Sequence, residues 1–229
     1  MRTLQQPLFT PETEWVPPDR LPDLSSYSEI AIDLETRDPN LLTMGSGAVR
    51  GDGEIVGIAV AVEGWSGYFP IAHEGGGNMD RGLVLDWFEE LLSNTSTKIF
   101  HNAMYDVSWI RSLGFYINGG IIDTMIAASL IDENRFSYTL DSVGKDYINM
   151  RKNEKLLQEA AKDFGVNPKA EMWRLPAPFV GEYAEKDAEM TLKLWHALQH
   201  EISKQDLWDI FNLETQLFPC LVDMKFKGV

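Results

Sequence analysis

Four carboxylates and one tyrosine stand in three short segments of this 229-residue chain. Asp33 and Glu35 occur two residues apart in IAIDLETRD, where an apolar alternation ends, so both would project from one face of a strand. Asp106 occurs in HNAMYDVSWI, and Tyr183 precedes Asp187 by one helical turn in YAEKDAEMTLKLW. Taken singly, each carboxylate is more often a solvated surface residue. Brought together they would repel one another, and divalent cations that prefer oxygen ligands relieve such repulsion.

The secondary-structure elements that must position these residues can be predicted from the sequence pattern. Strands are predicted at 28–36, 53–65, 66–73, within 98–103 and at the start of 119–134. The first three have short Gly-containing connections, which indicates an antiparallel meander. Helices then alternate with the remaining strands, so we expect an α/β fold with a mixed sheet covered by helices. If the strands at 29–35 and 98–102 are neighbours, all four carboxylates can meet at one sheet edge.

Apolar residues at helical spacing predict the helices. They are expected at 81–94, 104–114, the end of 119–134, 138–148, 152–165, 175–203 and 207–227. Leu83, Trp87 and Leu91 form the expected buried stripe of the first helix. Trp109 and Trp195 fall on similar stripes, so we expect both in the core.

Composition and charge limit the possible classes of function. No run of about 18 apolar residues predicts a membrane span, and the first residues lack a secretory signal, so a cytoplasmic location is expected. The net charge of −15 argues against a broad basic surface for a nucleic-acid duplex but allows contact with a few nucleotides. Cys220 in LFPCLVDM is expected to be buried and unreactive. The histidines have no partners at zinc-like spacing and are interpreted as ordinary surface or core residues: His73, His101, His196 and His200.

The three segments also resemble a known family. IAIDLET, HNAMYD and YAEKDAEMTLKLW are similar, in this order, to the exonuclease motifs of the DEDD superfamily of 3′–5′ exonucleases. Tyr183 matches the tyrosine subtype, because the histidine subtype would carry His where Glu182 stands. IIDTMIAASLIDEN, YTLDSVGKDYI and LFPCLVDMKFKGV resemble segments of the proofreading domain of bacterial and phage family A DNA polymerases. The resemblance covers about residues 28–229, after a Pro-rich extension over 1–27, and a polymerase domain would be expected to start where the chain ends.

The resemblance implies a ribonuclease H-like fold and hydrolysis of phosphodiesters by two divalent metal ions, Mg²⁺ or Mn²⁺. Asp33 would bridge both ions, and Glu35 and Asp187 would complete the site on the side of the nucleophile. Asp106 would hold the second ion, and Tyr183 would orient the attacking water. The implied activity releases nucleoside 5′-monophosphates from the 3′ end of single-stranded DNA, as proofreading for a polymerase domain of the same parent protein.

Substrate contacts are less well defined by the sequence. Tyr105 would either stack on a terminal base or pack inside the protein. Leu41, with Leu42, would form an apolar wedge between bases or, as the favoured reading, a buried loop anchor. Asn102 is predicted on the helix face that carries Asp106, where it would bond near the 3′ end or hold the first strand.

The segment over 151–174 departs from the bacterial polymerase pattern. Its basic residues would line a path for single-stranded DNA or form a solvated helix face: Lys152, Lys155, Lys162, Lys169 and Arg174. Interleaved acidic residues at Glu154, Glu159 and Asp163 favour the solvated face, so no site residue is assigned there.

Two alternatives to a DNA-proofreading enzyme remain open at this point. The first is a non-catalytic structural module of a polymerase, although such modules lose the carboxylates and this chain keeps all four. The second is a free-standing RNA-trimming exonuclease of the same superfamily, which would usually bring a helical RNA-binding domain. For any of them we expect a monomer that does not bind membranes.

Overall fold

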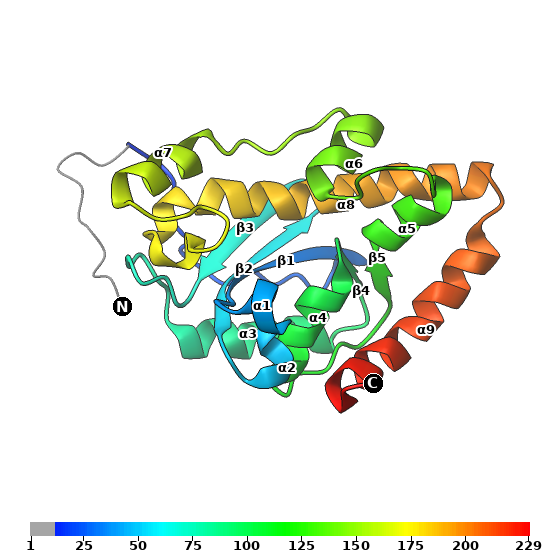
Figure 1. Ribbon diagram of the computed structural model, residues 1–229, viewed down its shortest axis with the longest axis horizontal. Coiled ribbons are helices and arrows are strands. Elements are labelled where there is room, and N and C mark those ends of the chain that lie inside the picture. Colours follow the sequence, from blue (N-terminus) through cyan, green and yellow to red (C-terminus); the bar gives the residue numbers. More distant parts are fainter. Residues whose placement is uncertain (1–11) are drawn as a thin grey trace.

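A computed structural model describes residues 12–229 and contains one five-stranded mixed sheet (Figure 1). The strands are β1 (Glu29–Arg37), β2 (Glu54–Val62), β3 (Trp65–Pro70), β4 (Thr97–Phe100) and β5 (Ile121–Asp123). Their order across the sheet is β3-β2-β1-β4-β5, with β1, β2 and β3 antiparallel and β4 and β5 parallel to β1. The predicted meander, the mixed sheet and the contact between the first and fourth strands are therefore confirmed.

Helices surround the sheet. They are α1 (Leu41–Met44), α2 (Gly47–Arg50), α3 (Arg81–Ser93), α4 (Ala103–Ser112), α5 (Thr124–Ile131), α6 (Leu140–Ile148), α7 (Lys155–Phe164), α8 (Gly181–Lys204) and α9 (Trp208–Lys227). The helices α3 to α9 correspond to the predicted segments, although α8 begins at Gly181 instead of residue 175 and the short helices α1 and α2 were not predicted. Two short 3₁₀ helices, η1 (Met172–Arg174) and η2 (Ala177–Phe179), precede α8. None of the helices described within residues 12–229 is long and apolar enough to cross a membrane.

The two faces of β1 carry different side chains because successive residues of a strand point to opposite sides. Ile30 and Ile32 pack in the cluster formed with α3 and α4. Ala31 packs in a second cluster, which contains the buried residues of α5 and α8. The long helix α8 crosses the sheet on one side, while α3 and α4 lie on the other (Figure 1). The small side chain of Ala31 leaves space for α8 to lie close to β1.

The buried stripe of α3 differs from the one predicted. Leu83 is exposed and Trp87 is only partly buried, whereas Val84 and Phe88 are buried together with Leu91. Leu83 and Val84 are both apolar, so spacing alone did not determine which of them faces the sheet. Packing against the sheet selects the Val84 side.

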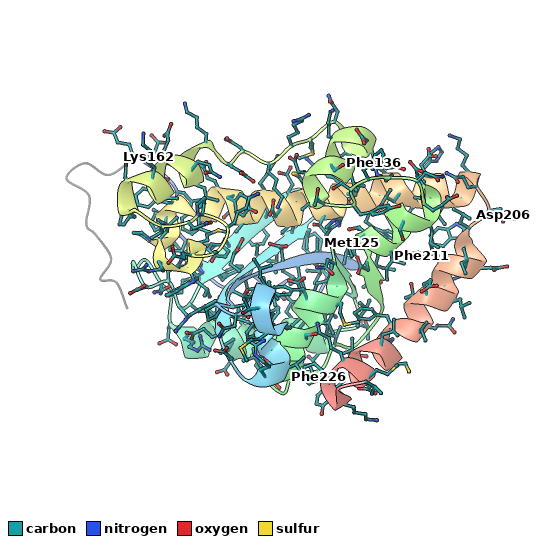
Figure 2. The ribbon with its side chains drawn as sticks, in the orientation of Figure 1. Met125, Phe136, Lys162, Asp206, Phe211 and Phe226 are labelled. Atoms are coloured by element: carbon teal, nitrogen blue, oxygen red, sulfur yellow. The ribbon has the colours of Figure 1, made fainter. Side chains whose placement is uncertain are left out.

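The helix α9 lies at the end of the domain that carries β5 (Figure 1). Phe211 near its start stacks on Trp195 of α8, with ring centroids 5.4 Å apart, and Phe226 near its end lies under the guanidinium of Arg111 at 4.7 Å (Figure 2). Trp195 is buried, as predicted. Cys220 is exposed, so the prediction of a buried thiol is wrong. It lies on the α9 face opposite the buried residues, and apolar neighbours in the sequence did not reveal this.

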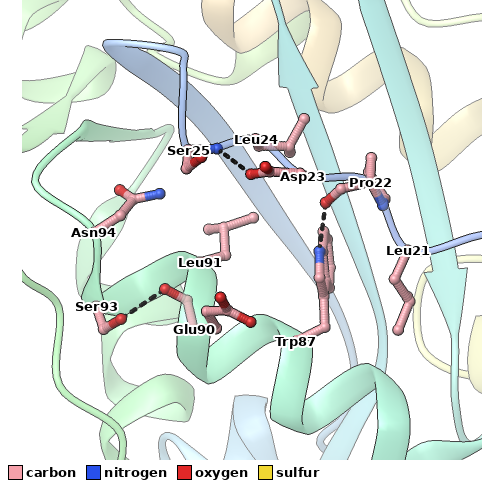
Figure 3. Close-up of a pocket in the computed structure, with 10 residues that line it drawn as sticks. All are labelled: Leu21, Pro22, Asp23, Leu24, Ser25, Trp87, Glu90, Leu91, Ser93 and Asn94. Carbon is pink, nitrogen blue, oxygen red and sulfur yellow. Dashed lines mark hydrogen bonds between the residues drawn. The ribbon is translucent and has the colours of Figure 1, made fainter.

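The described part of the N-terminal arm packs along the domain. Trp87 of α3 donates a hydrogen bond from Nε1 to the carbonyl oxygen of Pro22 at 2.8 Å (Figure 3). Trp15 donates from Nε1 to Glu185 of α8 at 2.9 Å. Glu185 also accepts the backbone N–H of Tyr68 in β3. These bonds hold the arm against the body at Trp15 and Pro22, while residues 1–11 of the predicted extension fall outside the described residues.

His73 is buried inside the domain, and His101 is partly buried. His73 contacts the carbonyl oxygen of Leu175 through Nδ1 at 2.9 Å and the hydroxyl of Tyr68 through Nε2 at 2.7 Å. Burial lowers the pKa of His73 and of His101 to about 4, so both side chains are neutral at physiological pH. They are structural residues, as the sequence predicted.

Candidate active site

The strand β1 places Asp33 and Glu35 side by side. Both follow Ala31 at the two-residue period, so they point to the face that α8 covers. The pairing register of β1 with β2 shifts directly after Glu35, and such a bulge changes the direction of the following side chains. Opposite Glu35 stands Gly57, where a Cβ would lie 2.0 Å from the Tyr68 hydroxyl. Glycine is therefore required for Tyr68 to pack against the sheet at this point.

Asp106 reaches the same strand from α4. In the described sheet, β4 pairs with β1 only over Glu29–Ala31. Farther along, the N–H of Leu34 donates to Oδ1 of Asp106 at 3.0 Å. Asp106 is 4% exposed, and its carboxylate thus takes the hydrogen-bonding place of a neighbouring strand between Asp33 and Glu35. The buried position contradicts the surface interpretation of Asp106 taken singly.

The start of α8 carries Tyr183 and Asp187 on one face, as their four-residue spacing predicts. Asp187 is 3% exposed, so it does not belong to a solvated acidic face. The helix begins at Gly181, where a Cβ would lie 2.0 Å from the ring of Trp15. This close contact lets the arm hold the first turn of α8 against the domain and so helps position Tyr183.

Asp123, at the end of β5, supports the site and was missed in the sequence. Its carboxylate accepts the N–H groups of Asn102 and Ala103 at 2.9 and 2.8 Å, and that of Met125 at 2.9 Å. One buried side chain therefore binds the amino ends of both α4 and α5. The signal was present, because Asp before a helix in IIDT is a typical N-cap.

Asn102 does not share a helix face with Asp106, contrary to the prediction. It is the residue before α4, with φ +67°, a left-handed conformation that Asn tolerates better than most residues. Its side chain is exposed. Asn102 therefore turns the chain from β4 into α4, which carries Asp106.

The electrostatics of the carboxyl groups indicate that they lie close together. Loss of hydration, followed by repulsion from Asp187, raises the pKa of Asp33 to about 7. Loss of hydration and then repulsion from Asp33 raise the pKa of both Glu35 and Asp106 well above their ordinary values. Burial also raises the pKa of Asp187, although the positive charge of Lys152 opposes that effect. The predicted convergence of the four carboxylates is present in the fold.

Lys152 completes this cluster, contrary to its interpretation as part of a solvated helix face. It lies in the connection between α6 and α7, and its Nζ is 2.5 Å from Oδ2 of Asp187 and 3.0 Å from the hydroxyl of Tyr183. Its ammonium also interacts with Asp33 and Glu35. Nothing in the local sequence separates Lys152 from its neighbouring lysines. Lys155, Lys162 and Lys169 are exposed, as predicted. The side chain of Arg174 is only 11% exposed and pairs with Glu74 and Glu171, so it does not belong to a solvated face.

Tyr183 is held as a neutral phenol. Burial, followed by the charges of Asp187 and Glu35, raises the pKa of its hydroxyl. A phenol in this state donates a hydrogen bond and does not act as a base near neutral pH. The hydroxyl can therefore orient a water molecule but not deprotonate it.

The candidate substrate residues lie around the end of β1. The hydroxyl of Tyr105 contacts the Thr36 hydroxyl at 2.6 Å, and its ring packs edge-on against Trp109 at 6.4 Å. This geometry gives Tyr105 a packing role. Leu41 is 38% and Leu42 97% exposed, so the favoured interpretation as a buried loop anchor is wrong. Both leucines belong to the short helix α1, directly after β1.

The donor set suits hard divalent cations. All its ligating atoms are oxygens, and the charges repel one another until a cation binds among them. Oδ1 of Asp187 is buried and has no hydrogen-bond partner in the described part of the chain. With the side chains as they stand, no group of three or more His, Cys, Asp or Glu residues within 12–229 forms a ready metal cage. The ammonium of Lys152 is in contact with Asp187.

A groove of about 440 Å³ opens beside the cluster. Lys152 and Tyr183 line it, and Leu140, Leu157 and Met172 add apolar surface. Its mixed lining suits a ligand with both a charged and a flat apolar part. A different cavity, of about 330 Å³, lies between the arm and α3 (Figure 3). The lining of that second cavity includes neither the four acids nor Lys152 and Tyr183, which contact them from the groove, so it is not the candidate site.

Comparison with known proteins decides the family. A family model described as 3′–5′ exonuclease matches residues 17–203, which include all four carboxylates and the tyrosine. A DNA-directed DNA polymerase of Pseudomonas phage M6 is 39% identical over 242 residues, covering 100% of this chain and 36% of that protein. The chain belongs to the 3′–5′ exonuclease domains of family A DNA polymerases.

Other members of this exonuclease family are more distant. DNA polymerase I of Borreliella burgdorferi is 25% identical over 214 residues, covering 92% of this chain and 22% of that protein. The chain thus spans about a third or less of the length of these two relatives.

Solved structures support the fold. NrnC of Brucella melitensis, in a structure with bound Mg²⁺, has a TM-score of 0.63 at 18% identity, covering 93% of this chain and 92% of that chain. RNase D of Escherichia coli has a TM-score of 0.59 at 15% identity, covering 90% and 46%. At these identities the likeness concerns the fold alone, and it confirms the predicted ribonuclease H-like architecture.

Proposed function

We propose that this domain is a metal-dependent exonuclease that removes nucleoside 5′-monophosphates from the 3′ end of single-stranded DNA. The observation that carries the proposal is the convergence of four acidic side chains from β1, α4 and α8, each with a raised pKa. Such an arrangement destabilises a protein unless cations bind to it. The chain retains every acid and the tyrosine, which argues against a non-catalytic module.

The acids would hold two Mg²⁺ or Mn²⁺ ions. When bound, the ions would acidify a water molecule and stabilise the charge that develops on the scissile phosphate. Asp33 repels Asp187 and Asp106 and would be a ligand of both ions. Glu35 and Asp187 would be further ligands of one ion. Asp106, which accepts a hydrogen bond from the N–H of Leu34, would be a ligand of the other.

The residues of this chain would divide the remaining work. The hydroxyl of Tyr183 would donate a hydrogen bond that aims the attacking water, because its raised pKa keeps its proton in place. The hydroxyl of Thr36 bonds to that of Tyr105 next to the acids. The ring of Tyr105 would limit the position of the last nucleotide there. The exposed Leu41 would contact the base at the 3′ end, and Asn102 would bond near it.

The biological context is also a proposal. The relatives that match this chain over its length are DNA polymerases. We infer that residues 28–229 act as the exonuclease domain of such a polymerase and proofread for its polymerase domain. The Brucella protein, which shares this fold, has a structure with bound Mg²⁺, and this is consistent with the proposed divalent ions. An RNA-trimming role is the second candidate, and the fold of RNase D favours testing it.

The test is a degradation assay on oligonucleotides labelled at the 5′ end. Single-stranded DNA and RNA of the same sequence would be incubated with the domain in Mg²⁺, in Mn²⁺ and in a chelator. We expect DNA to shorten from its 3′ end one nucleotide at a time in either metal, with 5′-monophosphates as products. Faster shortening of RNA would favour the second candidate. Intact DNA and intact RNA in both metals would refute the enzyme.

A further inference from the structure

Lys152 contacts two residues of the proposed reaction centre, yet no step of the proposed reaction uses it. We propose that Lys152 is an internal counter-ion that competes with the divalent metal for Asp187 and must leave this carboxylate when the metal binds. The inference rests on the proposed metal-dependent function. It assigns to this residue a positioning role, namely control of access of the metal to the site.

The contacts of the ammonium distinguish it from an ordinary surface ion pair. The Lys152 side chain is 19% exposed and that of Asp187 is 4% exposed. Nζ bonds to the Asp187 carboxylate and the Tyr183 hydroxyl, and it lies over the Tyr183 ring at 5.0 Å from its centroid. The attraction between the charges of an ion pair shielded from water in this way is stronger than in an exposed pair, and loss of hydration offsets part of it. Lys152 is therefore placed to neutralise part of the acidic cluster.

An ammonium and a divalent ion at one carboxylate repel each other, even when each takes a different oxygen. Oδ2 of Asp187 already accepts a hydrogen bond from Nζ at 2.5 Å, and a metal bound to Asp187 would bring two further positive charges to the same group. The repulsion between the ammonium and a divalent ion is twice that between two single positive charges at the same distance. Although Oδ1 of Asp187 has no hydrogen-bond partner in the described part of the chain, binding of the metal to Asp187 therefore favours departure of the ammonium.

The surroundings of Lys152 allow this movement. Its backbone is anchored, since its N–H donates to Oδ1 of Asp141 at 3.0 Å. Its side chain is a flexible four-carbon stem, which can move the ammonium without moving the backbone. The groove of about 440 Å³ lies directly beside it and gives the displaced ammonium a solvated place. Movement of this one side chain would open Asp187 to the metal.

The first experiment measures metal affinity and not activity. Mn²⁺ binding would be titrated calorimetrically on the wild-type chain, on Lys152→Met and on Lys169→Met. The last is the matched control, because Lys169 lines the same groove but is exposed. Methionine keeps the unbranched apolar stem and removes the charge. We expect Lys152→Met to bind Mn²⁺ about tenfold more tightly or better, since its competitor is gone, and Lys169→Met to stay within about twofold of wild type.

The outcomes separate this inference from the proposed function. Equal or weaker Mn²⁺ binding by folded Lys152→Met would overturn the counter-ion role while the metal-dependent function stands. Absence of Mn²⁺ binding to the wild-type chain would instead overturn the proposed function, and this inference with it. Circular dichroism reports whether each variant is folded.

A second measurement uses the wild-type chain and so does not depend on the folding of a variant. Lysines would be reductively methylated for short times with and without Mn²⁺, and the modified positions read by mass spectrometry. We expect Lys152 to react slowly without Mn²⁺ and several-fold faster with it, because displacement exposes the amine, whereas Lys169 reacts equally in both. A rate at Lys152 that Mn²⁺ leaves unchanged or lowers would refute the displacement.

Discussion

Replacing Asp33 by Asn should stabilise the protein when metal is chelated. The folded environment raises the pKa of Asp33 to about 7 from its ordinary value of 3.8. The folded state therefore binds more protons than the unfolded state between these two values, so the free energy of unfolding falls as the pH rises from about 4 to 7. Asn has the same shape and carries no charge at any pH, so the variant should not suffer this loss.

The size of the effect follows from the same two pKa values. Their difference of about 3 pH units corresponds to an upper limit of roughly 4 kcal/mol at pH 8. Asp33 keeps partial exposure, and solvent screening reduces this to about 2 kcal/mol. For a domain of this size the gain corresponds to about 4–8 °C in Tm.

The assay is urea unfolding in a chelator at pH 4 and at pH 8. Glu89→Gln is the matched control, since Glu89 is an exposed acid of α3 away from the cluster. Asp33→Asn should exceed the wild type in stability at pH 8 and lose that advantage at pH 4, while Glu89→Gln should differ little at either pH. A variant that is less stable than the wild type at pH 8, or whose advantage does not change with pH, would refute the reasoning about repulsion.

Three further predictions concern the site and its support. The double substitution Asp33→Ala with Glu35→Ala should reduce degradation of single-stranded DNA by more than roughly 100-fold and leave the circular dichroism spectrum unchanged. Loss of a residue that only supports a metal ligand typically costs roughly 10–100-fold, and here two ligands themselves are removed. Substantial digestion by the purified double variant would contradict the assignment. Tyr183→Phe should slow the same reaction about 100-fold, because the water loses its donor, while calorimetric Mn²⁺ binding persists; loss of Mn²⁺ binding would show that the hydroxyl serves the metal instead. Asp123→Ala should lower the free energy of unfolding by about 1–3 kcal/mol, measured in urea, because buried N–H groups at the starts of α4 and α5 lose their acceptor; unchanged stability would mean that water replaces the carboxylate.

The amino-acid sequence by itself determined the local elements and the identity of the acids. The two-residue period of β1 placed Asp33 and Glu35 on one face, and the four-residue spacing placed Tyr183 and Asp187 on one helix face. These relations hold within a few residues, where backbone geometry alone sets the direction of each side chain. The order of the three motifs then indicated the family, because each motif has a recognisable local pattern.

Only the tertiary structure decided which residues meet across the chain. Asp106 bonds to the backbone of a residue 72 positions earlier, and Lys152 reaches Asp187 across 35 positions. The exposure of Cys220 and the side of α3 that is buried also depended on neighbouring elements. Such contacts are set by how whole elements pack, and a lysine that pairs with a buried acid looks the same in the sequence as one that faces water.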